Sequence, residues 1–152
     1  RFWENPSLSS AETESLLSAR TRLQDLLSSH AETGDFGLIH ADALRENVLV
    51  HDGGVRLIDF DDGVFGFRMY ELGVAMSQNW DQPNQLALGA ALLRGYGQLR
   101  RLPDDAPALL TAFTVMRGLA SCGWVMGRYE TRDPAVRDYA ERALTMVARW
   151  QG

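Results

Sequence analysis

Four residues in the first half of the chain combine the side chains that phosphoryl transfer requires. Asp42 and Asn47 are five positions apart, His40 precedes them, and Asp59 follows on the next apolar run. Carboxylate and amide oxygens are ligands that Mg²⁺ accepts, usually together with the phosphates of a substrate. A second carboxylate beside the metal could accept the proton of a hydroxyl or orient that hydroxyl. The pattern indicates a site that holds a metal ion and a phosphate beside a hydroxyl group.

A short β-hairpin is predicted to bring two of these residues together. Residues 48–50 are apolar and rich in β-branched side chains, residues 55–58 resume an extended pattern, and Asp52-Gly53-Gly54 between them is typical of a tight turn. Asn47 would then lie at the start of the first strand and Asp59 at the end of the second. Because a hairpin places those two ends side by side, Asn47 and Asp59 are predicted to be neighbours.

The rest of the chain has the apolar spacing of helices. Ser9 and Glu12 form a capping-box pattern that opens a first helix, expected to run to about Ser29. Residues 33–35 are predicted to end it. Later helices are predicted over 69–79, from Pro83, after Pro107, and after the cap formed by Asp133-Pro134.

Two short segments around the hairpin are predicted to be irregular or merely extended. Residues 36–39 read as an extended approach to His40, and the glycines at positions 63 and 66 indicate a loop. The fold class predicted is therefore mainly α with one small β-hairpin, in a single domain over residues 1–152.

Composition excludes several classes of function. The 152 residues are 45% hydrophobic and 23% charged, as in ordinary globular domains, and the net charge of −5 disfavours nucleic acid as a partner. One cysteine, Cys122, rules out an internal disulfide and a cysteine-rich zinc site, and it favours a cytoplasmic location. The most apolar stretch, 108–129, contains Arg117, so we expect a buried helix and no membrane partner.

The block from Leu38 to Met76 resembles the aminoglycoside phosphotransferase and choline/homoserine kinase group. The segment His40–Asn47 is similar to the H-x-D-x-x-x-x-N catalytic loop, and Ile58–Asp62 is similar to the segment that supplies a metal ligand. Tyr70–Gly73 resembles the Tyr-Asp-Leu-Ala segment of that group. The resemblance implies the helical C-terminal lobe of a protein-kinase-like fold, and transfer of the ATP γ-phosphoryl group to a hydroxyl of a small molecule.

The resemblance also implies a role for each matching residue. Asp42 would be the catalytic base, and Asn47 and Asp59 would bind Mg²⁺. His40 and Glu71 would hold the catalytic loop, although the group usually has aspartate where Glu71 stands. The group also usually has glycine at the position of Ala41 in this chain, a mild change that should not remove the chemistry.

Several further residues have two possible interpretations. Asp61 and Asp62 could bind metal or substrate, or they could belong to a solvated turn. Phe60 is expected to point into the core and fix the aspartate before it. The three arginines Arg68, Arg117 and Arg128 could meet phosphate or an acidic substrate, and solvated arginines with buried stems explain them as well.

No segment before residue 38 resembles a nucleotide-binding lobe. There is no glycine-rich loop and no V-A-I-K motif with its lysine. We therefore expect that the nucleotide-binding lobe lies upstream in a longer protein and that this chain alone has little or no kinase activity. Two alternatives stay open: a non-catalytic interaction or sensor module on the same scaffold, and a metal-dependent phosphohydrolase. The motifs do not identify the hydroxyl acceptor.

Overall fold

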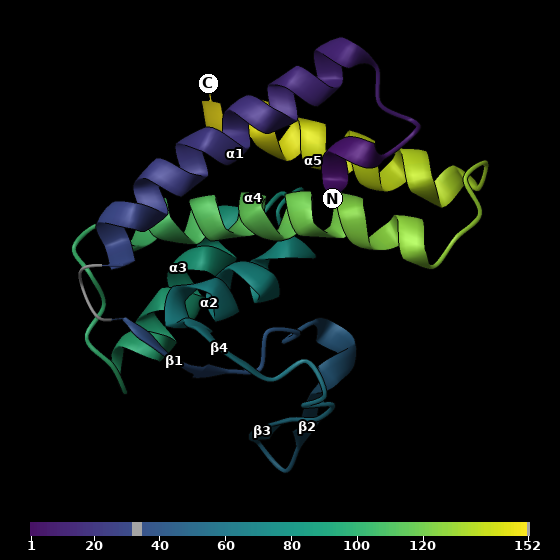
Figure 1. The fold of residues 1–152 in the computed structure, drawn as a ribbon. Coiled ribbons are helices and arrows are strands. Elements are labelled where there is room, and N and C mark those ends of the chain that lie inside the picture. The colour runs from purple at the N-terminus through teal and green to yellow at the C-terminus, as the bar shows by residue number, and fades with distance from the viewer. Residues whose placement is uncertain (32–34, 152) are drawn as a thin grey trace. The chain divides into compact units, whose positions relative to one another are not determined.

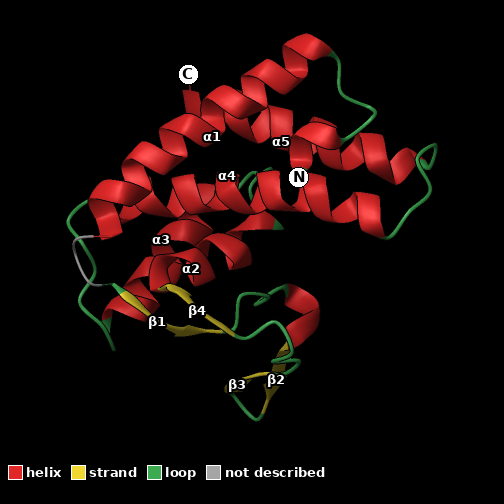
Figure 2. Ribbon diagram, in the orientation of Figure 1, coloured by secondary structure: helices red, strands yellow, loops and turns green. Residues whose placement is uncertain are grey.

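Helices make up most of the fold and strands only a small part of it (Figure 2). The computed structural model describes residues 1–31 and 35–151. Its helices are α1 (Ser10–Ala31), α2 (Arg68–Ser77), α3 (Gln85–Gly97), α4 (Ala106–Trp124) and α5 (Pro134–Gln151), with short 3₁₀ turns at Phe2–Glu4, Arg45–Asn47 and Val125–Gly127. Its strands are β1 (Phe36–Ile39), β2 (Val48–His51), β3 (Gly54–Leu57) and β4 (Val64–Phe67). The mainly α class with a small hairpin is confirmed.

The chain divides into two compact units, which are described separately. Unit 1 comprises residues 1–30 and 115–152, and unit 2 comprises residues 31–114. Unit 1 is helical and contains α1, α5 and the second half of α4. Unit 2 contains all four strands, α2, α3 and the first half of α4.

The N-terminus of α1 in unit 1 is capped as the sequence predicts. The backbone N–H of Ser9 donates to Glu12 Oε2 at 2.8 Å, and the N–H of Glu12 donates to Ser9 Oγ at 3.3 Å. Glu12 also accepts a hydrogen bond from Arg137 of α5, with Nη2 2.8 Å from Oε1. The predicted end of the helix at residues 33–35 falls mostly outside the described residues.

The two later helices of unit 1 pack through small and apolar residues. An added Cβ at Gly118 of α4 would lie 2.5 Å from the sulfur of Met146 in α5, so the two helices approach closely there. Asp133 caps α5 by accepting the N–H of Ala135 at 2.9 Å, as predicted. Buried Asn5 donates to the carbonyls of Cys122 and Val136, each at 3.2 Å. The buried amide of Asn5 is therefore hydrogen-bonded within unit 1.

The strands of unit 2 form two separate antiparallel pairs (Figure 1). The predicted hairpin is present as β2 and β3, with Val48 opposite Leu57. The second pair is a correction: β4 occupies 64–67, where the glycines indicated a loop, and it pairs with β1 so that Leu38 lies opposite Phe65. Gly66 fits this arrangement, because it pairs directly with Gly37 and leaves room for the side chain of Ile39, whereas Gly63 lies in the loop just before β4.

Helix α2 contacts both β1 and β4 as well as α3. Gly73 of α2 lies against Phe113 of α4, where an added Cβ would be 2.6 Å from the Phe113 backbone. Phe113 itself is fully buried and stacks with Phe67 and Tyr70. Helix α3 begins at Gln85, two residues later than the predicted start at Pro83.

The apolar stretch formed by α4 and the turn after it belongs to the core, because more than half of its most apolar window is buried. Residues Ala106–Gly127 are long and apolar enough to cross a membrane by length and composition, and 56% of their most apolar window is buried. Buried core helices of globular proteins have the same composition, so this segment gives only weak support for a membrane span.

Candidate active site

The loop after β1 is organised around the buried side chain of His40. The backbone N–H of Asp42 donates to His40 Nδ1 at 3.3 Å. Because Nδ1 accepts a hydrogen bond, the ring proton lies on Nε2, which donates to the carbonyl of Ile58 at 2.8 Å. His40 is 4% exposed, so both contacts are shielded from water. The ring thus ties the loop to the end of the hairpin.

Glu71 of α2 holds the same loop from the other side. Its Oε1 accepts the N–H of His40 at 3.1 Å, and its Oε2 accepts the N–H of Ala41 at 2.9 Å. Ala41 has a φ of 64°, a left-handed conformation that costs a residue with a Cβ some strain. Two hydrogen bonds to one carboxylate stabilise that conformation, since charged acceptors make strong hydrogen bonds. These are the contacts that the predicted supporting role requires.

Asn47 links the loop to Asp42 and to the hairpin. Its Nδ2 donates to the Asp42 carbonyl at 2.9 Å and to Asp42 Oδ2 at 3.0 Å. Its own carbonyl accepts the N–H of Ile58 at 3.1 Å, which extends the pairing of β2 with β3 by one step. Asp59 follows Ile58 directly, so the hairpin does bring the neighbourhoods of Asn47 and Asp59 together.

The segment that begins with Asp59 differs from the loop because it is exposed. Asp59 has a φ of 62°, which aspartate tolerates better than most residues. Asp61 and Asp62 are exposed as well. Phe60 corrects a prediction: it is 62% exposed and does not enter the core. Its ring lies 4.5 Å from the ring of His40, so one face of Phe60 covers the histidine and the rest meets solvent.

The donor set fits a metal ion that is shared with a phosphate ligand. Among the described residues, no three His, Cys, Asp or Glu side chains come together as a metal site. Asn47 uses its amide nitrogen on Asp42, so its Oδ1 could serve as a metal ligand, and Asp59 would add a carboxylate. So few protein ligands suit Mg²⁺ with substrate phosphates and not a closed structural site. The phosphohydrolase alternative would need further His or Asp ligands, which the described residues do not place here.

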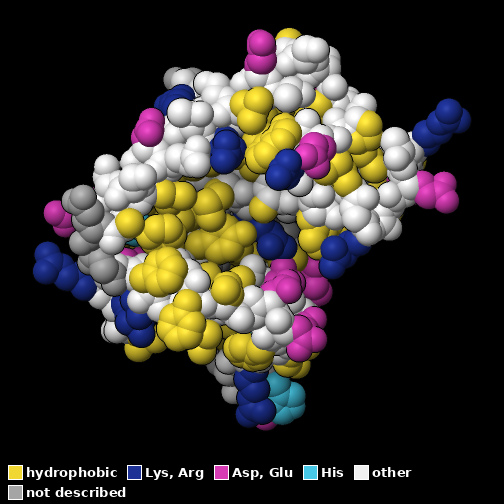
Figure 3. Space-filling view, in the orientation of Figure 1, with side chains coloured by type: hydrophobic (Ala, Val, Ile, Leu, Met, Phe, Trp, Pro, Cys, Tyr) yellow, Lys and Arg dark blue, Asp and Glu magenta, His cyan; other side chains and the backbone are white. Residues whose placement is uncertain are grey.

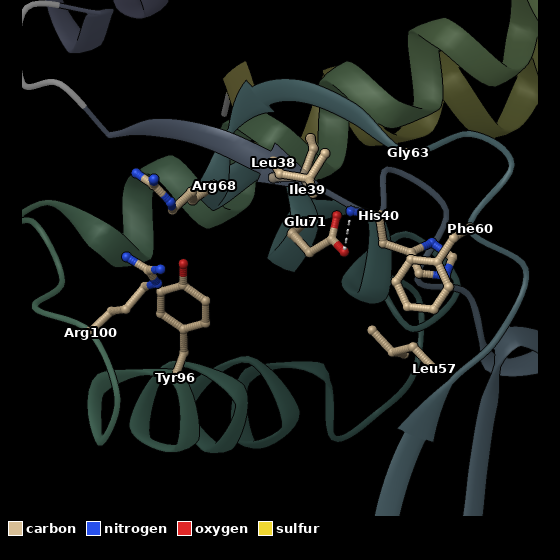
Figure 4. A pocket seen from close by; sticks show the side chains of 10 residues that line it. All are labelled: Leu38, Ile39, His40, Leu57, Phe60, Gly63, Arg68, Glu71, Tyr96 and Arg100. Atoms are coloured by element: carbon tan, nitrogen blue, oxygen red, sulfur yellow. Dashed lines mark hydrogen bonds between the residues drawn. The ribbon is translucent and has the colours of Figure 1, made fainter.

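A cavity of about 470 Å³ lies behind the catalytic loop in unit 2 (Figure 4). Glu71 and His40 line it, together with Arg68, Tyr96 and Arg100. Sequence reasoning singled out Arg68 but missed Tyr96 and Arg100. No motif connects these residues, and only the packing of α3 beside α2 brings them to one place.

Comparison with known families identifies the family to which the chain belongs. The chain belongs to the phosphotransferase enzyme family, whose model matches residues 2–110. The motif block described above lies wholly within the matched region.

Individual relatives and solved structures support the same family and fold. A homoserine kinase from Neisseria meningitidis serogroup B is 34% identical over 108 residues, which are 68% of this chain and 34% of the relative. An uncharacterized protein from Deinococcus radiodurans is 30% identical over 146 residues, 90% of this chain and 42% of the relative. The structure of a microcompartment-associated aminopropanol kinase superposes with a TM-score of 0.88 at 28% identity, covering 99% of this chain and 49% of that one.

A more distant structure shows the shared fold alone. An amicoumacin kinase, solved in complex with AMP-PNP, Ca²⁺ and Ami, gives a TM-score of 0.74 at 19% identity over 98% of this chain and 48% of its own. The chain thus spans between a third and a half of the length of the relatives it matches. The predicted resemblance and fold class are confirmed.

Proposed function

We propose that this chain is the catalytic-loop lobe of a small-molecule kinase that transfers the ATP γ-phosphoryl group to a hydroxyl. The observation that carries the proposal is the joined hydrogen-bond network from Glu71 through the loop to Asn47 and the hairpin. It holds Asp42 and Asn47 in one loop and joins that loop to the hairpin at Ile58, the residue before Asp59, and phosphoryl transfer depends mainly on positioning of this kind. Membership of the phosphotransferase family supports the same reading.

In this proposal Asp42 orients the acceptor hydroxyl and takes its proton. The side chain is half-buried and is held by Asn47 Nδ2, so its direction is set before a substrate arrives. Asn47 Oδ1 and the Asp59 carboxylate would hold Mg²⁺ with the phosphates of ATP. The bound ion would supply neutralisation of the charge on the transferring group. His40 and Glu71 do not touch the substrate and act by holding the loop.

The nucleotide-binding lobe is proposed to lie in another part of a longer protein. All fifteen basic residues of this chain are arginine, so it contains no lysine to bind the ATP phosphates. The relatives that it matches are about twice as long. We propose that residues 1–152 are a single C-terminal lobe, that the protein is cytoplasmic, and that the isolated chain turns over little ATP.

The acceptor is proposed to be a small amino alcohol. Homoserine kinase and aminopropanol kinase are named for substrates that carry both a hydroxyl and an amine, and they are 34% and 28% identical to this chain. The exposed carboxylates of Asp61 and Asp62 follow the proposed metal ligand and could pair with an ammonium group or with the metal. They are the residues on which acceptor choice would be tested.

The experiment that tests the metal site is calorimetric titration of ATP in the presence and absence of Mg²⁺. Asp59→Asn removes the charge and keeps a residue that accepts a positive φ. We expect this variant to lose the Mg²⁺-dependent part of ATP binding, whereas Asp104→Asn, in an exposed connection, should retain it. Mg²⁺-dependent binding that is equal in both variants would show that Asp59 is not a ligand.

The alternative of a non-catalytic interaction module has a separate readout. The longer protein, with the proposed nucleotide-binding lobe, should transfer phosphate from ATP to an amino alcohol such as homoserine or 1-amino-2-propanol. If the folded protein binds nucleotide but transfers no phosphate to any amino alcohol or simple alcohol, the interaction module becomes the better reading.

A further inference from the structure

The cavity behind the catalytic loop is separate from the proposed transfer site. Asp42, Asn47 and Asp59 are not among the residues that line it. Figure 4 shows its two ends: Leu57 and Phe60 at one end, Arg68, Tyr96 and Arg100 at the other, and Glu71 between them. A binding site here would therefore have a function of its own.

Arg68 is fixed in place at the basic end of the cavity. Its Nη1 lies 3.6 Å from Asp35 Oδ1, and its side chain is only 25% exposed. Its guanidinium lies over Gly37, where an added Cβ would be 2.2 Å from Nη2. Gly37 has no side chain to occupy that space, so the guanidinium of Arg68 lies close to the backbone of β1. A pre-positioned guanidinium loses little entropy when it binds a ligand.

Tyr96 and Arg100 of the α3 region complete the basic end. Burial, followed by the negative charge of Asp35, raises the pKa of the Tyr96 hydroxyl, which therefore stays protonated and can donate a hydrogen bond. Arg100 is exposed and makes no ion pair with another residue in the described part of the chain. Its guanidinium is available to a ligand without breaking an existing salt bridge.

The polar groups at this end are donors, and the opposite walls are apolar. Two guanidinium groups and a phenol hydroxyl face the space between α2 and α3, while Glu71 already accepts two backbone N–H groups. Leu38, Leu57 and Phe60 are large hydrophobic residues that stay exposed beside it. The lining has two arginines and one carboxylate, that of Glu71, and Asp35 lies beside Arg68; in a chain of net charge −5, the lining itself still favours an anionic ligand.

We propose that this cavity binds a small organic oxyanion, a phosphate monoester or a carboxylate attached to an apolar group. Arg68, Arg100 and the Tyr96 hydroxyl would bind the anionic oxygens, because guanidinium groups match both phosphate and carboxylate geometry. The apolar group would lie against Leu57 and Phe60. Glu71 and His40 line the cavity and also hold the catalytic loop. A ligand bound in the cavity would therefore change the surroundings of that loop.

The test is titration of the chain with phenyl phosphate, benzoate and benzyl alcohol in EDTA, so that no metal site contributes. We expect at least one of the two anions to bind and the neutral alcohol to bind at least about tenfold more weakly. In ¹⁵N-edited NMR spectra, the bound anion should shift the amide signals of Gly37, His40 and Ala41. Binding of phenyl phosphate alone identifies the phosphate as the ligand class, and binding of benzoate alone identifies the carboxylate.

Three variants of α3 and its C-terminal turn locate the binding. Arg100→Gln should weaken anion binding by about tenfold, because one charged hydrogen-bonding group is lost. Arg94→Gln, an exposed arginine on the same helix that does not line the cavity, should leave the affinity unchanged. Tyr96→Phe provides a second measurement within the cavity and should also weaken binding.

Three results would overturn the proposal. One is no binding of either anion at millimolar concentration, and another is equal binding of benzyl alcohol. The third is an affinity that Arg100→Gln and Tyr96→Phe leave unchanged. None of these measurements uses ATP or phosphoryl transfer, so the proposal stands or falls independently of the proposed kinase activity.

Discussion

The two units of the molecule differ in how completely they cover their apolar side chains. Among the described residues, fourteen large hydrophobic side chains are exposed, and twelve of them belong to unit 2. Figure 3 shows hydrophobic side chains gathered in the lower part of the view, where the strands of unit 2 lie. Unit 1 exposes only Trp124 and Tyr129 of this kind. Surfaces of that composition usually bind something.

The same contrast divides the candidate site within unit 2. The loop residues His40 and Asn47 are buried and hydrogen-bonded, whereas every residue from Leu49 to Phe65 is exposed. The chain thus fixes the loop that carries Asp42 and leaves open the segment that carries Asp59, one of the two proposed metal ligands. This difference is what we expect if a nucleotide-binding lobe covers the part of the segment around Asp59 in the longer protein.

The largest stability effect is expected where the buried loop depends on one carboxylate. Glu71→Gln leaves a single side-chain acceptor for the N–H groups of His40 and Ala41, and it points an amide N–H at one of them. An unpaired donor and a lost charged hydrogen bond should lower the free energy of unfolding by about 2 kcal/mol. Urea unfolding followed by circular dichroism measures this change.

The matched control lies in unit 1. Glu14→Gln changes the same functional group at an exposed position of α1 and should alter the free energy of unfolding by less than about 0.5 kcal/mol. Equal effects of the two substitutions would contradict the claim that Glu71 organises the loop.

A smaller effect on stability is expected at Gly73 of α2, two residues after Glu71, where the helix lies close to Phe113. Gly73→Ala adds a Cβ only 2.6 Å from Phe113, and the overpacking should exceed the gain in helix propensity. The net loss is expected to be about 1 kcal/mol. Gly95→Ala in α3 meets open space, so it should instead raise stability by about 0.5 kcal/mol. Thermal unfolding of both variants measures these changes in stability. Stability changes of the same sign in the two variants would contradict the expectation.

The smallest effect concerns the pH dependence of unit 1. Hydrogen bonding from Arg137, and then from the backbone of Ser9, lowers the pKa of Glu12 from 4.5 to about 2. The unfolded chain therefore binds this proton first as pH falls, so the stability that Glu12 adds is present above about pH 4.5 and is lost towards pH 2. Glu12→Gln should be less stable than the unchanged chain at pH 6 and equal to it at pH 2, as measured by urea unfolding. A difference in stability between the two chains that does not vary with pH would contradict the assignment of this pH dependence to Glu12.

Local signals in the sequence predicted the elements that depend on neighbouring residues. The capping box of Ser9 and Glu12 and the turn at Asp52 to Gly54 each act within a few positions, and both are present in the structure. The hairpin then places Ile58 beside Asn47 by its register alone. The family and fold class followed from motifs that lie within this one local region.

Features that depend on distant parts of the chain were missed. Strand β4 pairs with β1 across an intervening hairpin, and each strand has only four residues, so no period was visible and the two glycines suggested a loop. Phe60 was expected in the core because it is aromatic, but its one packing partner on this face is the ring of His40. The cavity residues Tyr96 and Arg100 are 25 or more positions from Glu71 and could be placed only by tertiary packing.

The proposed function is tested most directly by the turnover of Asp42→Asn in the longer protein that includes the nucleotide-binding lobe. Transfer from ATP to an amino alcohol should fall by about 10²- to 10⁴-fold, because a general base is removed while the side-chain shape and the contact with Asn47 are nearly kept. Asp52→Asn, in the exposed hairpin turn, should retain full turnover. Unchanged turnover in Asp42→Asn would contradict the account that this loop performs phosphoryl transfer.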